Sequence, residues 1–327
     1  MKIAILGASG IGKSHARWFS LHGCDIVSIL GSSDASAART GAQLYEEFGF
    51  LATSYSNLTA LLHETSPDAV CIATPSTLHF LQALECLEAG AHVLCEKPLV
   101  YAPGRKIREN LDGAKELVRL ARKKNLVLGT QLQYGAATPI LCKLAGTTPP
   151  EVGDFAVELE TVNPKASRDP HELWIDLGPH ALAIAQFLGG EGAQLSEDSV
   201  RLRHSQNFDA TEVAARFQIA SSGGRLLTCR TVVRALDNPF STRKPSRRFA
   251  FNGRVVTYEG VRAENGEYQA QYTAPDGYIN VHPDPVSYLI SEFLRAIRER
   301  HNPVISGEFG MQNLEWLLKI AAKFESE

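Results

Sequence analysis

Three residue types that can move protons stand in two short stretches of the chain. Lys97 follows an apolar run, with Glu96 before it and Pro98 after it, and Asp176 and His180 lie four residues apart in the stretch HELWIDLGPHALAI. A four-residue spacing places two side chains on one side of a helix. An ammonium, a carboxylate and an imidazole brought together can transfer a proton at a hydroxyl or carbonyl group near neutral pH.

Each of these residues also has an ordinary structural role. Loop lysines are mostly solvated, an aspartate often caps a helix N-terminus, and a histidine can be a hydrogen-bonded part of the core. However, a charged pair at the end of an apolar strand, followed by a proline that fixes the turn, is well suited to placing the Lys97 ammonium in a cleft. The bond between Lys97 and Pro98 can be cis or trans, and the sequence leaves this open.

Three glycines follow the first apolar run, in the stretch ILGASGIGKSHARWF. We expect a strand, a turn at Gly7, Gly10 and Gly12, and then a helix. This order suits a dinucleotide-binding unit, because glycine lets a pyrophosphate approach the main chain and the helix N-terminus supplies unpaired N–H groups. Ser9 stands where the pattern G-x-G-x-x-G has its middle glycine, so a simple strand-to-helix turn is the alternative.

The elements that must position these residues alternate regularly in the first part of the chain. Nearly continuous apolar runs predict buried strands, and helical patterns between them predict crossovers, so we expect a doubly wound α/β domain over residues 1–129. Ligands of such sheets lie at the carboxyl ends of the strands, where the glycine turn, ATPSTLHF and CEKPL follow three of them. The expected strands are 3–6, 25–30, 69–74, 92–95 and 126–130, and the expected helices are 12–22, 34–48, 57–64, 78–89 and 112–124.

The texture changes in the second part, which we assign to a substrate-binding domain over residues 130–327. Runs such as GDFAVELET and RRFAFNGRVVTYEG alternate apolar and polar residues, as an antiparallel sheet with one wet face requires. We expect a helix near 178–188, and helices near 285–299 and 307–325 that cover the other face of this sheet. The predicted class is therefore an α+β domain with an open, mainly antiparallel sheet.

Bulk composition excludes several classes of protein. The chain has 327 residues, 44% of them hydrophobic, and a formal net charge of -3, so nothing in its composition suggests a surface for nucleic acid or an anionic membrane. It also has no apolar run of about 20 residues and no apparent signal peptide, so we expect it in the cytoplasm. The six cysteines form no C-x-x-C pair, and we expect them to be reduced, buried and without metal.

Several motifs together resemble the glucose-fructose oxidoreductase and inositol dehydrogenase family (Gfo/Idh/MocA). They are the glycines and His15 of the first turn, TPSTLH, AGAHVLCEKPL and DLGPH, which occur in the family's order. The resemblance implies an NAD- or NADP-dependent hydride transfer to or from a sugar, a polyol or a related compound. It also implies that His180 is the acid/base, that Lys97 stabilises charge on the reacting oxygen, and that Asp176 orients the substrate.

The cofactor and its contacts follow from the same resemblance. The strand that ends at Leu30 is followed by Gly31 and serines, whereas NAD-selective sites usually have an acid there, so we predict NADP in preference to NAD. The residues expected to bind the cofactor are Gly7, Ser9, Gly10, Ile11, Gly12, Ser32, Ser33, Arg39, Thr74, Pro75, His79, Glu96 and Lys97.

The substrate and the assembly are less constrained. Many relatives carry an acid shortly after the residue that matches His180, and this sequence does not. Neighbouring segments contain residues that can border the pocket: Tyr134, Asn163, Lys165, Arg168 and His171. Two alternatives share the fold: a non-catalytic dinucleotide-binding sensor, and a redox-neutral glycoside hydrolase that oxidises and re-reduces its sugar. An open sheet favours a homodimer or homotetramer.

Overall fold

The computed structural model describes residues 1–162, 169–206, 210–236, 245–263 and 268–326. The chain forms two compact units. The first unit comprises Met1–Gln131 and Val286–Leu314, and the second comprises Leu132–Pro285 and Glu315–Glu327. In the described part of the chain, no helix has both the length and the apolar character that a membrane span needs.

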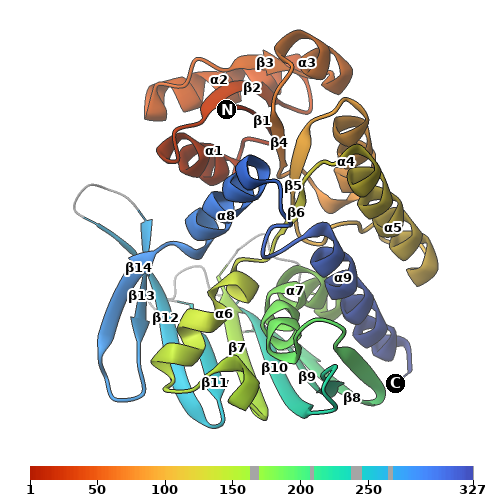
Figure 1. Ribbon diagram of the computed structural model, residues 1–327, viewed down its shortest axis with the longest axis vertical. Coiled ribbons are helices and arrows are strands. Elements are labelled where there is room, and N and C mark those ends of the chain that lie inside the picture. The colour runs from red at the N-terminus through yellow and green to blue at the C-terminus, as the bar shows by residue number, and fades with distance from the viewer. Residues whose placement is uncertain (163–168, 207–209, 237–244, 264–267, 327) are drawn as a thin grey trace. The chain divides into compact units, whose positions relative to one another are not determined.

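The first unit contains a six-stranded parallel sheet in the order β3-β2-β1-β4-β5-β6 (Figure 1). This is the dinucleotide-binding order, so the predicted doubly wound fold is confirmed. The one unpredicted strand, β3, has three residues, too few to show a periodic pattern. The elements are β1 (Lys2–Leu6), β2 (Asp25–Leu30), β3 (Thr53–Tyr55), β4 (Ala69–Ile72), β5 (His92–Glu96), β6 (Leu128–Gln131), α1 (Ile11–Leu21), α2 (Asp34–Phe48), α3 (Leu58–Thr65), α4 (Ser76–Glu88) and α5 (Ile107–Lys124).

A helix from the end of the chain completes the first unit. On one face of the sheet, Ile3 and Ile5 of β1 pack in a cluster with α1 and with α8 (Pro285–Glu299). The rings of Phe19 and Phe293 meet edge to face, with centroids 6.4 Å apart. We expected α8 to cover the second sheet. Its amphipathic pattern identifies it as a surface helix, but periodicity does not specify which sheet a helix covers.

The second unit contains an eight-stranded sheet in the order β14-β13-β12-β11-β7-β10-β9-β8 (Figure 1). Among the described residues β7 and β10 pair in parallel and the other neighbours pair antiparallel, which confirms the predicted open, mainly antiparallel sheet. The strands are β7 (Asp154–Thr161), β8 (Gln194–Gln206), β9 (Ala210–Ala220), β10 (Leu226–Leu236), β11 (Arg247–Phe251), β12 (Arg254–Arg262), β13 (Tyr268–Thr273) and β14 (Ile279–Pro283).

The helix α7 (Pro170–Gly189) packs against this sheet, and α6 (Gln133–Leu144), which was not predicted, packs on α7. The prediction of a helix at 178–188 was too short. Asp169 caps α7, since its carboxylate accepts from the main-chain N–H groups of His171 and Glu172, and Pro170 occupies the first turn. The remaining elements are α9 (Gly307–Ala321) and two short 3₁₀ helices, Pro149–Glu151 and Ala322–Ser326.

Candidate active site

The glycine turn after β1 has the backbone geometry of a phosphate cradle. Gly7 and Gly10 have φ of 79° and 65°, which side chains rarely tolerate. A Cβ on Gly12 would lie 2.1 Å from the carbonyl oxygen of Gly7, so the start of α1 can approach the turn only as glycine. Ser9 and Ile11 are exposed beside the helix N-terminus, where the first N–H groups lack intrahelical partners.

Glu96, at the end of β5, joins this helix to the turn that carries Lys97. Its carboxylate lies 2.8 Å from Nε2 of His15, a fully buried residue of α1. Its second oxygen accepts the main-chain N–H of Lys97 at 3.2 Å. The pair spans 81 positions of sequence, so no local pattern could predict it. The Glu96 carboxylate therefore holds helix α1 and the Lys97 turn together.

His79, near the start of α4, fixes two neighbouring loops. Its ring is 1% exposed, with Nδ1 2.8 Å from the carbonyl oxygen of Pro98 and Nε2 2.9 Å from that of Thr74. Burial lowers the pKa of His79, although both carbonyl contacts and Glu96 act in the other direction. The Lys97–Pro98 peptide bond is cis. His79 thus spans the loop after β4 and the turn after β5, while Pro75 precedes the first residue of α4.

The loop after β2 is open and polar. Ser32, Ser33 and Arg39 are exposed, and Ser33 caps α2 by accepting the N–H of Ser36 at 3.2 Å. Asp34 is the acid nearest to this loop, and its carboxylate accepts a hydrogen bond from the Ser56 hydroxyl.

These four loops lie at one edge of the first sheet. The strands β2, β1, β4 and β5 are adjacent and parallel, so their carboxyl ends bring together the glycine turn, the serines, Thr74 and Lys97. Glycines at positive φ, a close approach of main chain at Gly12 and unpaired N–H groups at the start of α1 suit a dinucleotide pyrophosphate.

Asp176 and His180 lie in the second unit, on α7. The helix begins earlier than expected, so both residues sit in its middle rather than in its first turn. Asp176 is exposed and His180 is 8% exposed. Pro179, inside the helix, lacks an N–H and leaves one main-chain carbonyl without its usual partner in the preceding turn.

An aromatic cluster packs beside His180. Tyr134 of α6 meets the His180 ring with centroids 5.4 Å apart, and it also contacts Phe249 and Tyr258 of the sheet at 5.4 and 5.9 Å. Burial raises the pKa of Tyr134 to about 12, so its phenol stays protonated. The sequence analysis named Tyr134 as a residue that can border the pocket, but it did not predict the contact with His180. His171 packs on Phe324, and Asn163, Lys165 and Arg168 lie outside the described residues.

The cysteines take no part in these arrangements. All six are free and buried, and burial raises the pKa of the Cys71 and Cys95 thiols well above the usual range. Within the described residues, no group of three or more His, Cys, Asp or Glu side chains is placed to hold a metal ion.

Known proteins resemble the chain in two different ways. Curated relatives match only part of the chain. A 1,5-anhydro-D-fructose reductase of Ensifer adhaerens is 36% identical over 130 residues, 38% of this chain and 34% of the relative. A D-glucoside 3-dehydrogenase of Escherichia coli is 32% identical over 119 residues, 36% of this chain and 32% of the relative. These matches span about a third of the relatives' length.

Solved structures resemble the whole chain. UDP-N-acetylglucosamine 3-dehydrogenase GnnA of Acidithiobacillus ferrooxidans has a TM-score of 0.70 at 20% identity, over 98% of this chain and 97% of that one. KijD10, a 3-ketoreductase of Actinomadura kijaniata in complex with NADP, has a TM-score of 0.67 at 18% identity, over 97% and 95% of the two chains. At these identities the likeness shows a common fold.

One family model matches the first part of the chain. The model of GFO_IDH_MocA, described as an oxidoreductase family with an NAD-binding Rossmann fold, matches residues 1–132. This range contains the glycine turn, the loops that His79 spans and the Lys97 turn. Residues 1–132 are therefore similar to the NAD-binding Rossmann fold of the GFO_IDH_MocA oxidoreductase family, in agreement with the strand order of the first sheet.

Proposed function

We propose that this protein is an NAD- or NADP-dependent oxidoreductase that transfers a hydride between the nicotinamide and a CH–OH or carbonyl group of a sugar, a polyol or a related compound. The observation that carries the proposal is the Lys97 turn, which Glu96 and His79 hold at the carboxyl edge of a dinucleotide-binding sheet. The named functions of the relatives, which act on sugars and their keto forms, support the same class of substrate.

The side chains of this chain supply the proton chemistry, and the cofactor when bound accepts or donates the hydride. His180 takes the hydroxyl proton during oxidation and returns it during reduction. The Lys97 ammonium donates a hydrogen bond to the same oxygen and stabilises the negative charge that develops there. Asp176, one helical turn before His180, orients the substrate and the imidazole.

The first unit would hold the dinucleotide along its carboxyl edge. Gly7, Ser9, Gly10, Ile11 and Gly12 would surround the pyrophosphate through main-chain N–H groups and the Ser9 hydroxyl. Thr74, Pro75 and Lys97 would border the nicotinamide. We assign His79 and Glu96 an indirect part, in which they hold the loops, because their polar atoms already contact main-chain carbonyls, the Lys97 N–H and His15.

We further propose that NADP binds more tightly than NAD. Ser32 and Ser33 can donate hydrogen bonds to a 2′-phosphate, and the exposed Arg39 can pair with it. A hydrogen bond to a charged group contributes about 1.5–3 kcal/mol, which corresponds to roughly ten- to over a hundredfold in affinity. Titrations of NADPH and NADH by fluorescence would check this preference, and equal dissociation constants for both would contradict it. Arg39→Gln should weaken the binding of NADPH and leave the binding of NADH unchanged.

The experiment that tests the main proposal follows reduced nicotinamide by absorbance. The protein is offered NADP or NAD with a panel of sugars, polyols and their keto forms, beside Lys97→Ala and the surface control Lys115→Ala. A substrate-dependent signal that falls by a factor on the order of 10²–10³ in Lys97→Ala, and persists in the control, would support a dehydrogenase. A bound cofactor with no signal across the panel would favour the sensor or the redox-neutral hydrolase instead.

We also propose that the protein acts in the cytoplasm as a homodimer or homotetramer. The six free, buried thiols suit a reducing compartment. The open second sheet has a face on which a second copy can pack. Light scattering coupled to gel filtration would measure the assembly, and a monomer at micromolar concentration would contradict this part of the proposal.

A further inference from the structure

A cavity of about 890 Å³ lies within the first unit, away from the loops described above. His92, at the start of β5, and Val127, just before β6, line it, so it stands at the amino ends of these strands. Glu96 and Lys97 stand at the carboxyl end of β5. The cavity therefore lies at the opposite edge of the sheet from the dinucleotide, and it has the volume of a small-molecule site.

Basic and amide side chains dominate the wall of this cavity. Arg122 and Arg300, His92 and His301, and Asn125 and Asn302 all line it, and no Asp or Glu does among the described residues. Arg122 pairs with an acid that does not line the cavity, since its Nε lies 2.6 Å from the carboxylate of Glu308. Arg300 is exposed and makes no ion pair with the described residues. On a chain with a net charge of -3, this is a local excess of positive charge.

The helices α5 and α8 end at this cavity. Main-chain carbonyl groups at a helix C-terminus would repel an anion unless they accepted hydrogen bonds. The N–H of Leu126 donates to the carbonyl of Ala121 at the end of α5, and the N–H of His301 donates to Ala296 at the end of α8. Asn125 and Arg300 allow this closure by adopting φ of 55° and 56°. The closed ends leave the side chains to determine the charge of the cavity.

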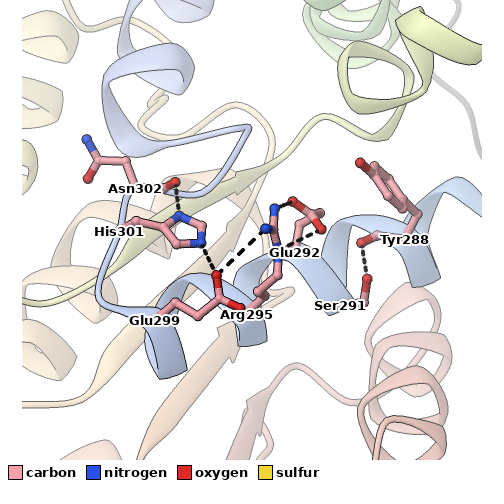
Figure 2. A network of polar contacts seen from close by, with 7 residues as sticks. All are labelled: Tyr288, Ser291, Glu292, Arg295, Glu299, His301 and Asn302. Carbon is pink, nitrogen blue, oxygen red and sulfur yellow. Dashed lines mark hydrogen bonds and ion pairs between the residues drawn. The ribbon is translucent and has the colours of Figure 1, made fainter.

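The two histidines are held in defined orientations. Nδ1 of His92 accepts the main-chain N–H of Val127 at 2.8 Å, and burial lowers the pKa of His92, so its neutral ring carries the proton on Nε2 as a donor. His301 donates from Nδ1 to the carbonyl of Asn302 at 2.7 Å, and its Nε2 lies 3.3 Å from Glu299 (Figure 2).

The carboxylates near His301 are themselves paired. Figure 2 shows Arg295 between Glu292 and Glu299. The guanidinium lies 3.7 Å from the carboxylate of Glu299. Arg295, on the same helix, pairs with Glu299, whereas the exposed Arg300 guanidinium makes no ion pair with the described residues. The polar wall is therefore organised before any ligand arrives.

We propose that this cavity binds a small organic anion, whose phosphate or carboxylate pairs with Arg300 and Arg122 while His92 and the two asparagines donate to its other oxygens. Val127 and Ile297 provide an apolar surface for its carbon atoms. Guanidinium groups match both anions in geometry and charge. The proposal does not depend on the oxidoreductase activity, because its residues lie at the opposite edge of the sheet.

The test is isothermal titration calorimetry of the whole protein with 3-phosphoglycerate, which carries both anionic groups, in the presence of saturating NADP so that the dinucleotide site is filled. Glycerol 3-phosphate and citrate are titrated separately to distinguish phosphate from carboxylate, and glycerol is the uncharged control. Saturable binding of 3-phosphoglycerate and of at least one single-class anion, without glycerol binding, is expected.

Variants locate the binding site. Arg300→Gln and Arg122→Gln should each weaken binding about tenfold or more. The control Arg119→Gln should leave binding unchanged, because Arg119 is an exposed residue of the same helix as Arg122 but does not line the cavity. Glu308→Gln releases Arg122 and should tighten binding about two- to fivefold. Thermal unfolding of each variant checks that it folds. Absence of saturable binding to the wild type, or unchanged affinity in both cavity variants, would overturn the proposal.

Discussion

The Lys97 turn of the first unit and the His180 helix of the second are built from different interactions. Hydrogen bonds hold the turn, through Glu96 to His15 and through His79 to two main-chain carbonyls. At His180 the contact described is aromatic: its ring lies 5.4 Å from that of Tyr134. A turn has no hydrogen-bond ladder of its own, so buried polar side chains must fix its main chain, whereas most of the main chain of a helix is satisfied within the helix.

This difference predicts that substitutions will act unequally on chemistry and on structure. At His180 the imidazole can be removed while the helix keeps its own hydrogen bonds. At the Lys97 turn, a change in a supporting residue alters the main chain on which Lys97 is placed. We therefore expect the largest pure loss of catalysis in the second unit, and mixed losses of activity and stability in the first.

The largest effect is expected from His180→Gln. Removal of a general acid/base slows a reaction by a factor on the order of 10²–10⁴, and the change should fall on kcat, with the NADPH dissociation constant within about twofold of the wild type. Steady-state kinetics and cofactor titration measure the two quantities. Tyr134→Phe is the matched variant, because it keeps the ring beside His180 and should retain activity within about fivefold. If Tyr134→Phe loses as much as His180→Gln, aromatic packing is not what orients the imidazole.

A smaller, mixed effect is expected from Glu96→Gln. The amide keeps the size of the side chain but loses the charge that faces His15 and the Lys97 N–H. Because hydrogen bonds to charged groups contribute about 1.5–3 kcal/mol, the free energy of unfolding should fall by about that amount. Urea unfolding measures it, and kcat should fall at the same time. Glu46→Gln, an exposed residue of α2, is the control and should change neither. A loss of kcat without any loss of stability would place Glu96 in the chemistry instead.

The same contrast explains which parts of the molecule the sequence could predict. The strict alternation of strands and helices, the glycine turn and the period-two runs each reflect local rules, and the Rossmann sheet and the open sheet followed from them. The His15–Glu96 pair joins residues far apart in the chain, and the Tyr134–His180 contact depends on how two helices pack. Neither leaves a pattern in one sequence.

The errors have physical causes as well. Pro179 inside α7 made the earlier turns of this helix hard to recognise, although Asp169 and Pro170 carry its true start. The placement of α8 also failed, because an apolar helix face fits any sheet of matching shape, and Phe293 packs on Phe19 of the first unit. The candidate site was thus predicted as a set of residues, while their supporting contacts required the structure.

The smallest effect concerns the histidines that the first unit uses to hold its main chain. Burial lowers the pKa of His92, and its neutral Nδ1 accepts the Val127 N–H. The native state therefore disfavours the proton that the unfolded chain binds below a pH of about 6.5, so the contribution of His92 to stability is complete above that pH and is lost as the pH falls. Urea midpoints at pH 7 and pH 5 measure this loss.

The comparison of variants isolates His92 from the other titrating groups. His92→Gln lacks the titrating ring, so its stability should fall less between pH 7 and pH 5 than that of the wild type, while the exposed His63→Gln on α3 should match the wild type. Equal pH dependence in all three proteins would mean that the Val127 contact survives protonation. That result would show that the support His92 gives to the main chain of the first unit does not require a neutral ring.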